Sequence, residues 1–277
     1  MTSGAAAIRG ATLLPLLRAA HLGPTLAVTT IAALLTLALD LPLSLAVVVT
    51  AAVFTGQLTI GWGNDLLDAD RDRVVGRSDK PLAQGELVPS MVLRWLIVAA
   101  LACVMLSLLA GWRSGVTHLA LLVTSGHLYN LRLRSTAWSW LPYAVAFGSL
   151  PAVVSVADRP PQWPPGWMVG TAAALGIAAH LLNTLQDLED DAATGVHGLP
   201  HRLGAARSRA AATVLLVLAS AVAVLGPAGA PAAWAWTALA IVVALAAVAL
   251  VGSGKAPFYA AITIALVDVA LLAAVAP

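Results

Sequence analysis

The sequence contains a single cysteine, Cys103, which lies inside an apolar stretch. One cysteine cannot form an intrachain disulfide or supply a cysteine-based metal site. Charged residues are also scarce, because they make up 10% of the chain, against about 25% in soluble domains. The net charge of +2 is too small to indicate a nucleic acid as partner. Disulfide and thiolate–metal chemistry are therefore excluded, and we expect no nucleic-acid partner.

Apolar residues make up 60% of the chain, and the mean hydropathy is +0.89. Apolar runs of about 20 residues recur throughout, and runs of this length are typical of transmembrane helices. The first run continues to Leu39, too far for the apolar core of a cleavable signal peptide. The pattern predicts nine transmembrane helices, at residues 20–39, 43–62, 91–110, 115–131, 139–157, 166–184, 209–226, 232–251 and 256–275.

The breaks between these runs are rich in proline and glycine, and no long linker or soluble segment remains. We therefore expect residues 1–277 to form one all-α integral membrane domain. With the N-terminus in the cytoplasm, every Lys and Arg except Arg113 and Arg159 lies on the cytoplasmic side, as positive-inside topology requires. The C-terminus then lies outside. The Ala-, Gly- and Arg-rich, Lys-poor composition suggests a bacterial genome, and hence a bacterial plasma membrane.

Two predicted cytoplasmic loops, at about 63–90 and 185–208, contain every acidic residue except Asp40, Asp158 and Asp268. At about 100° per residue of helix, Asp65, Asp68 and Asp72 share one face within about 60°, whereas Asp70 points away. The carboxylates of the second cluster also share one helix face, because the directions of Asp187 and Asp191 differ by about 40°. Each cluster therefore resembles a carboxylate stripe at the cytoplasmic end of a transmembrane helix.

Polar residues extend both stripes towards the membrane: Asn64 precedes the first, and Asn183 and His180 precede the second. Polar groups at membrane depth are costly and normally face a cavity. Carboxylates this close together repel one another unless a cation separates them. Oxygen ligands alone suit Mg²⁺ or Ca²⁺, and Mg²⁺ usually completes its shell with water and phosphate oxygens. The two stripes therefore predict a Mg²⁺–diphosphate clamp, with nearby Arg side chains and Lys80 on the remaining phosphate oxygens.

Two other interpretations of these acids are open. They can belong to solvated loops in which acids and bases cancel, although such loops do not share a stripe that continues into the membrane. The alternation of Asp68, Asp70 and Asp72 also resembles a Ca²⁺-binding loop, but Arg73 stands where the EF-hand turn needs glycine.

The two acidic motifs resemble those of the UbiA superfamily of intramembrane aromatic prenyltransferases. Residues 64–72 match the family pattern NDxxDxxxD, and residues 187–191 match DxxxD. The stretches RSDKPLAQGEL (77–87), YNLRLR (129–134) and LPHRLG (199–204) are similar to further family segments. Two places depart from the pattern: Arg18 is followed by Ala rather than Pro, and His197 and Gly198 stand where a basic residue is common.

The resemblance implies nine helices bundled around a central cavity that opens to the cytoplasm. It also implies a Mg²⁺-dependent prenyltransferase that ionises an isoprenyl diphosphate and transfers the prenyl group to an aromatic or quinone-precursor-like acceptor among membrane lipids. On this basis Asp65, Asp68 and Asp72 form one metal and catalytic site, and Asp187 and Asp191 form the other. The predicted substrate-binding residues are Asn64, Arg77, Lys80, Tyr129, Arg132, Arg134 and Asn183.

Three rival functions remain. A terpene cyclase on the same scaffold would ionise the same diphosphate and let the carbocation close on itself, and the acidic motifs do not separate the two. A transporter would place its charges at the membrane midplane, whereas these acids lie at one end. A CDP-alcohol phosphotransferase needs a DG-x2-AR motif, which is absent. The sequence assigns no role to His180, His197 or Asp268, and it does not define the prenyl chain length or the oligomeric state.

Overall fold

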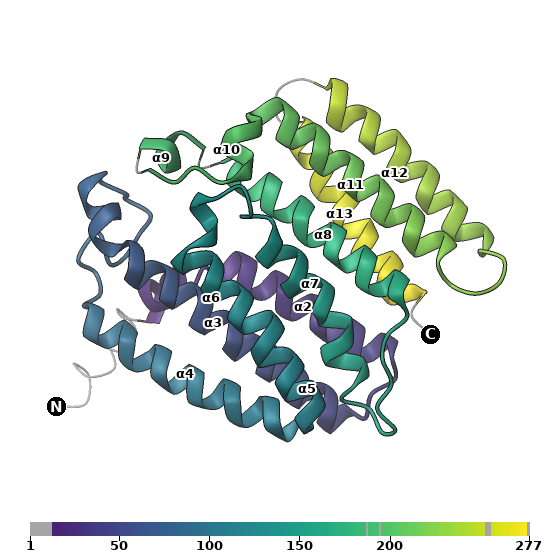
Figure 1. Cartoon of the computed structure of the whole chain (residues 1–277), viewed down its shortest axis with the longest axis horizontal. Helices are drawn as coiled ribbons and strands as arrows, with labels where there is room; N and C mark the ends of the chain where they lie inside the picture. The colour runs from purple at the N-terminus through teal and green to yellow at the C-terminus, as the bar shows by residue number, and fades with distance from the viewer. Residues whose placement is uncertain (1–12, 187, 194, 253–255, 276–277) are drawn as a thin grey trace.

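A computed structural model of the chain describes residues 13–186, 188–193, 195–252 and 256–275, and within them the regular structure is helical. Helices satisfy their backbone polar groups internally, which an apolar bilayer requires. The long helices run alongside one another in a single bundle (Figure 1). The elements are α2 (Leu22–Ala38), α3 (Leu43–Val74), α4 (Pro89–Leu109), α5 (Trp112–Thr117), the π-helix η1 (His118–Val123), α6 (Thr124–Leu131), the 3-10 turn η2 (Leu133–Ser135), α7 (Leu141–Ser155), α8 (Gly166–Thr184), α9 (Leu188–Ala193), α10 (Leu199–Leu203), α11 (Ala205–Leu225), α12 (Ala233–Val251) and α13 (Ala256–Ala274).

Four of the described helices, α3, α4, α11 and α12, are long and apolar enough to cross a membrane. A fifth span results if the short helix Leu13–Ala19 and α2 are taken together, although 72° separates their axes. The helices Leu141–Ser155 and Tyr259–Ala274 are apolar but shorter. Each predicted span contains helix, but the count of nine membrane crossings stays a prediction.

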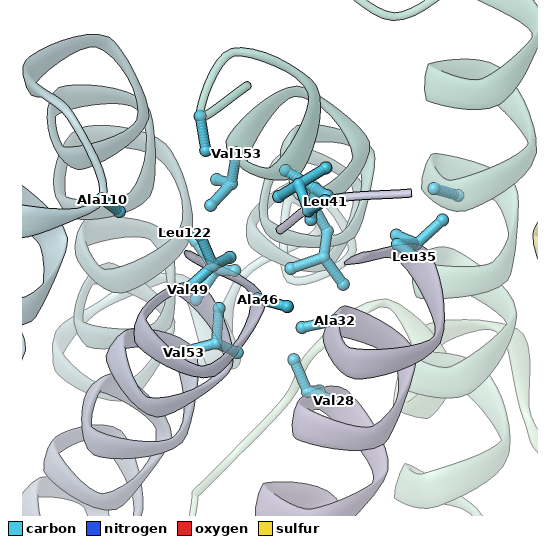
Figure 2. Packing of buried hydrophobic residues seen from close by; sticks show 14 of the residues in the cluster. Val28, Ala32, Leu35, Leu41, Ala46, Val49, Val53, Ala110, Leu122 and Val153 are labelled. Atoms are coloured by element: carbon cyan, nitrogen blue, oxygen red, sulfur yellow. The ribbon is translucent and has the colours of Figure 1, made fainter. Parts of the chain in front are cut away.

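Neighbours along the chain pack against each other, so α2 lies on α3, α3 on α4, and α7 on α8. In the second half α8 packs against α11, and α11, α12 and α13 all pack against one another. Helix α13 also contacts α2, which joins the C-terminal helix to the N-terminal half of the bundle. One buried apolar cluster connects α2, α3 and α7: Figure 2 shows Ala32, Val49 and Val153 meeting there with Leu122 of η1.

Helix α3 continues well past the predicted end of its span. The expected loop began at residue 63, but the helix runs unbroken to Val74 and has 32 residues. At 1.5 Å per residue it is about 48 Å long, whereas the hydrocarbon core of a bilayer is about 30 Å thick. The first acidic motif therefore lies on a rigid extension of a membrane-spanning helix.

The π-helix η1 interrupts the predicted span 115–131. In a regular α-helix, residues nine apart point to opposite sides, but a π-helix rotates less per residue. As a result His118 and His127 both contact α3. A methyl group on Gly56 would lie 3.2 Å from the His118 ring, and Nε2 of His127 lies 3.2 Å from Oγ1 of Thr59.

The two ends of the bundle differ in charge. Arg113 and Arg159 line the same hollow, of about 170 Å³, at one end. The acidic motifs lie at the opposite end, where α3 finishes and where α9 and α10 are seen in Figure 1. This separation agrees with the predicted charge distribution. Which end faces the cytoplasm stays a prediction.

Candidate active site

The first acidic motif forms the carboxylate stripe expected from its helical spacing. Asp65, Asp68 and Asp72 are buried, whereas the side chain of Asp70 is 96% exposed and pairs with Arg73 at 2.7 Å. The expected division of this motif into three inward acids and one outward acid is therefore confirmed.

Asp65 binds two side chains that are distant in sequence. Its Oδ1 accepts a hydrogen bond from Nζ of Lys80 at 2.7 Å and lies 3.0 Å from Nε2 of His21. Lys80 and His21 themselves approach to 2.9 Å. The other oxygen, Oδ2, is buried and has no hydrogen-bond partner among the described residues. One oxygen of this carboxylate is thus paired with basic groups, and the other is buried without a partner among the described residues.

His21 was not among the predicted site residues. It reaches Asp65 because the chain bends by 72° between the helix Leu13–Ala19 and α2, with His21 at the bend in a left-handed conformation (φ 52°). Arg18, where the sequence departs from the family pattern, does not bind Asp65. It pairs with Glu86 at 3.2 Å. A left-handed residue other than glycine is uncommon, but nothing local in the sequence marks it.

Asp68 carries the strongest interaction of the site. Both of its oxygens accept hydrogen bonds from the guanidinium of Arg134, each at 2.6 Å. Its Oδ2 also accepts from Asn64 at 3.1 Å and from Arg71 at 3.2 Å. Paired N–H groups on a carboxylate give both strength and orientation. Breaking a buried pair of this kind typically costs about 3–5 kcal/mol.

Arg77 binds within its own loop. Its guanidinium donates two hydrogen bonds to Asp79, both at 2.9 Å. The hydrogen bonds from Arg77 lower the pKa of the Asp79 carboxyl to about 2. The structure therefore shows Arg77 beside the site, and its predicted contact with diphosphate stays a prediction.

The second acidic motif is described only in part, because Asp187 lies outside the described residues. Asp191 is 23% exposed, and its Oδ2 lies 3.9 Å from Nε2 of His201. Asn183 and Arg132 are exposed, so solvent or a ligand can reach both. The assignment of Asp187 and Asp191 to a metal, and of Asn183 and Arg132 to the substrate, stays a prediction.

A polar connection joins the turn after α6 to the loop after the second acidic motif. Ser139 Oγ accepts the backbone N–H of Leu199 at 2.8 Å and lies 2.9 Å from Nε2 of His180. Gly198 fits tightly here, since a Cβ at this position would lie 2.6 Å from the carbonyl oxygen of Arg134. A larger side chain does not fit at position 198, which is a steric reason for glycine to stand where a basic residue is common in the family. His180, which had no predicted role, helps to hold this connection.

The donor atoms of the site suit a hard cation. Among the described residues no group of three or more His, Cys, Asp or Glu side chains is placed to hold a metal. Mg²⁺ needs fewer protein ligands, because it usually binds through one or two carboxylates and takes its other oxygens from water and phosphate. The buried, unpartnered Oδ2 of Asp65 is an oxygen of this kind. The residues therefore fit Mg²⁺ shared with a diphosphate, and they do not form a complete protein cage.

Comparison with known proteins places this geometry in a family. The model of the UbiA prenyltransferase family matches residues 24–275. The chain belongs to this family. It is 30% identical over 201 residues to a digeranylgeranylglyceryl phosphate synthase of Methanopyrus kandleri, covering 68% of this chain and 67% of the relative.

Solved structures of other UbiA homologues share the fold. The apo homologue from Aeropyrum pernix K1 has a TM-score of 0.70 at 18% identity, covering 90% of this chain and 96% of that one. A homologue from Archaeoglobus fulgidus bound to GPP and Mg²⁺ has a TM-score of 0.69 at 16% identity, covering 94% and 99%. At these identities the likeness establishes the fold alone. The named relatives come from archaea, so the bacterial source stays a prediction from composition.

In this UbiA-family site an aromatic wall lies next to the polar groups. The ring of Tyr129 meets that of Tyr143 edge-on at 5.1 Å between centroids, and the Tyr143 ring lies 4.8 Å from that of His180. Tyr129 and Arg134 both belong to the segment that follows η1. The predicted contact of Tyr129 with substrate stays a prediction.

Proposed function

We propose that this UbiA-family prenyltransferase uses Mg²⁺ to ionise an isoprenyl diphosphate and transfers the prenyl group to a lipophilic acceptor. The observation that carries the proposal is the pairing of two buried acids with two basic groups, Asp65 with Lys80 and Asp68 with Arg134. Acids and bases gathered at the end of an apolar bundle suit a ligand with an anionic head and an apolar tail. The homologue from Archaeoglobus fulgidus bound to GPP and Mg²⁺ supports this ligand class.

The reaction begins when the bond between the allylic carbon and the diphosphate oxygen breaks, and the electron pair leaves with the oxygen. Bound Mg²⁺ would supply positive charge to the leaving oxygens. Asp65, Asp68 and Asp72 would hold the metal, together with Asp187 and Asp191 from the second motif. Lys80 and Arg134 would contribute positive charge to the same oxygens.

The allylic carbocation must then be kept from water until the acceptor attacks. The side chains of Tyr129, Tyr143 and His180 provide an apolar and aromatic wall for this purpose. Exclusion of water also strengthens every charge interaction inside the site. The acceptor adds to the carbocation and loses a proton, which completes the transfer.

The acceptor class is the finer part of the proposal. An aromatic, quinone-precursor-like acceptor follows from the sequence resemblance. The relative named digeranylgeranylglyceryl phosphate synthase introduces a second class, a prenylated glyceryl phosphate. Both are lipophilic, and both would reach the site from the membrane.

The test uses purified full-length protein in lipid nanodiscs with geranyl or geranylgeranyl diphosphate. Diphosphate release and prenylated products are measured with and without Mg²⁺, and with an aromatic acceptor, a geranylgeranylglyceryl phosphate acceptor, or none. We expect Mg²⁺-dependent release and transfer to one acceptor class. Cyclised terpene formed without any acceptor would instead establish the cyclase alternative.

Matched variants link that activity to the stripe. Asp72→Asn removes a buried inward carboxylate, and Asp70→Asn removes the exposed carboxylate two residues away. We expect the first change to slow diphosphate release by about 100-fold or more, a typical cost of losing transition-state electrostatics. The second should leave the rate within about twofold. Equal rates in both variants would contradict the metal assignment.

A further inference from the structure

We infer that Arg134 is a displaceable counter-ion of Asp68, so that metal and diphosphate bind with positive coupling. Arg134 has to leave this carboxylate before Asp68 can coordinate a metal, and diphosphate offers it a new anionic partner. The inference rests on the proposed function, because it concerns the same metal and diphosphate. It goes further by assigning Arg134 a role in the order of binding.

The hydrogen bonds of Asp68 carry this inference. A carboxylate has about four lone-pair positions on its two oxygens. Oδ1 accepts one N–H of Arg134, and Oδ2 accepts from Arg134, Asn64 and Arg71. Arg134 therefore occupies both oxygens, and Oδ2 carries three of the four donated N–H groups. The Asp68 side chain is only 4% exposed, so a metal cannot approach from a solvated side while Arg134 stays in place.

The hydrogen-bond partners of Asp65 differ from those of Asp68, and this difference predicts the order in which the two acids engage the metal. Lys80 and His21 both approach its Oδ1, and Oδ2 has no hydrogen-bond partner among the described residues. Both side chains are buried, at 0% exposure for Asp65 and 4% for Asp68, so the two acids differ in their bound donors: a metal at Oδ2 of Asp65 would displace none. Asp68 becomes available only after Arg134 moves. The two acids of one stripe are thus expected to engage the metal at different stages.

Electrostatics favours the exchange once diphosphate arrives. A guanidinium and a divalent metal cannot share the oxygens of one carboxylate without strong repulsion in a buried site. Phosphate oxygens accept the paired N–H groups of Arg in the same planar geometry as a carboxylate does. Arg134 can therefore exchange one bidentate partner for another, which would leave Asp68 free to hold a metal. No covalent bond changes in this step.

The coupling has a measurable size and a required symmetry. If diphosphate tightens metal binding by some factor, the metal tightens diphosphate binding by the same factor. Couplings between ligands are typically about 5- to 150-fold. Direct contact between metal and diphosphate contributes to this factor in any protein. The part that requires Arg134 is therefore measured as a difference between variants.

The experiment measures the binding of Mn²⁺, used as a probe for Mg²⁺, to the full-length protein in detergent at pH 8. Electron paramagnetic resonance reports the concentration of the free ion. Binding is titrated with Mn²⁺ alone and with Mn²⁺ plus inorganic diphosphate. For the unaltered protein we expect diphosphate to tighten Mn²⁺ binding at least about 5-fold. An Mn²⁺ affinity that diphosphate leaves unchanged would overturn the inference without any variant.

The decisive variant is Arg134→Gln. We expect it to bind Mn²⁺ alone at least about 3-fold more tightly than the unaltered protein, and to show a smaller diphosphate effect. Arg134→Lys keeps the charge but loses the paired geometry, so its behaviour should lie between the two. The matched control is Arg73→Gln, which removes an Arg paired with the outward Asp70 and should leave Mn²⁺ binding within about 1.5-fold.

The outcomes separate the two proposals. Weaker Mn²⁺ binding in Arg134→Gln than in the unaltered protein means that Arg134 supports the metal site, and this overturns the counter-ion role even if prenyl transfer is intact. Tighter binding with lost coupling supports the role even if no prenyl product forms, in which case the proposed function alone has failed. A variant that does not fold is replaced by Arg134→Lys, for which Mn²⁺ binding no tighter than in the unaltered protein counts against the inference.

Discussion

Ser139 accepts the backbone N–H of Leu199 at 2.8 Å, across sixty positions of sequence. The same hydroxyl meets Nε2 of His180 on α8. The turn that contains Ser139 also carries Arg134, which binds Asp68 of the first acidic motif. A short segment therefore contacts the first motif through a side chain and the loop after the second motif through a hydroxyl. The relative position of the two acidic motifs depends on this segment.

Ser139→Ala should destabilise the protein and weaken substrate binding. The change leaves the Leu199 N–H without its acceptor in a buried place, a loss typically worth about 1–3 kcal/mol. We expect a thermal midpoint several degrees lower and a raised KM for the isoprenyl diphosphate. Ser139→Thr keeps the hydroxyl and should recover the KM. Ser135→Ala, at an exposed serine of the same turn, is the control and should change neither value.

Gly198→Ala tests the close contact beside this hydrogen bond. The new methyl group would lie 2.6 Å from the Arg134 carbonyl oxygen and 2.9 Å from Ser139 Oγ, so the loop has to move. We expect at least a 10-fold fall in kcat/KM, about 1.4 kcal/mol. Gly170→Ala in α8 meets nothing within 4 Å and should be neutral or slightly stabilising. A fully active Gly198→Ala enzyme would show that the loop tolerates displacement.

His21→Asn tests the residue that completes the Asp65 cluster. Asparagine tolerates the left-handed backbone of position 21, so the bend should survive while the contact with Asp65 is lost. We expect diphosphate release to slow by roughly 10-fold with a nearly unchanged thermal midpoint. His21→Gly, which also allows the bend, should behave in the same way. A midpoint that falls in both variants would indicate that His21 serves the fold and not the site.

The Arg77–Asp79 pair predicts a pH effect with a defined sign. The pKa of Asp79 in the folded protein is about 2, below the ordinary value of 3.8. A lowered carboxyl pKa stabilises the folded state above the unfolded pKa, and the gain is lost as pH falls towards 2. The thermal midpoint of the unaltered protein should therefore exceed that of Asp79→Asn at pH 6, and the difference should shrink by pH 3. A constant difference between these pH values would show that the pair does not set this pKa.

Local periodicity was sufficient to predict the helices and the carboxylate stripe. Helix α8 covers residues 166–184 as expected, because long apolar runs between prolines leave few alternatives. Asp65, Asp68 and Asp72 share one face because their helical spacing determines their relative directions, and their burial shows that this face is the inward one. The loop expected from residue 63 begins only after Val74, because hydropathy falls at residue 63 while the helical spacing of the acids continues. Apolar content marks the membrane span, not the end of the helix that contains it.

The partners of the acids depended on contacts that no local pattern contains. Lys80 reaches Asp65 by folding back across fifteen positions, and Arg134 reaches Asp68 across sixty-six. Both had been predicted to bind phosphate, but not to neutralise these acids. His21 was missed because its place depends on a sharp bend between two helices. The π-helix was also missed, since a widened turn has the same apolar composition as a regular one.

The unbroken length of α3 links the site to the bilayer itself. When the hydrocarbon thickness differs from the length of an apolar span, tilting of the helix is one way of adjusting. Since the carboxylates lie on the same rigid helix as the membrane span, any tilt changes their height above the lipid surface and their distance from the loop after α8. We therefore expect the acyl-chain length of the surrounding lipid to influence how well the two acidic motifs meet.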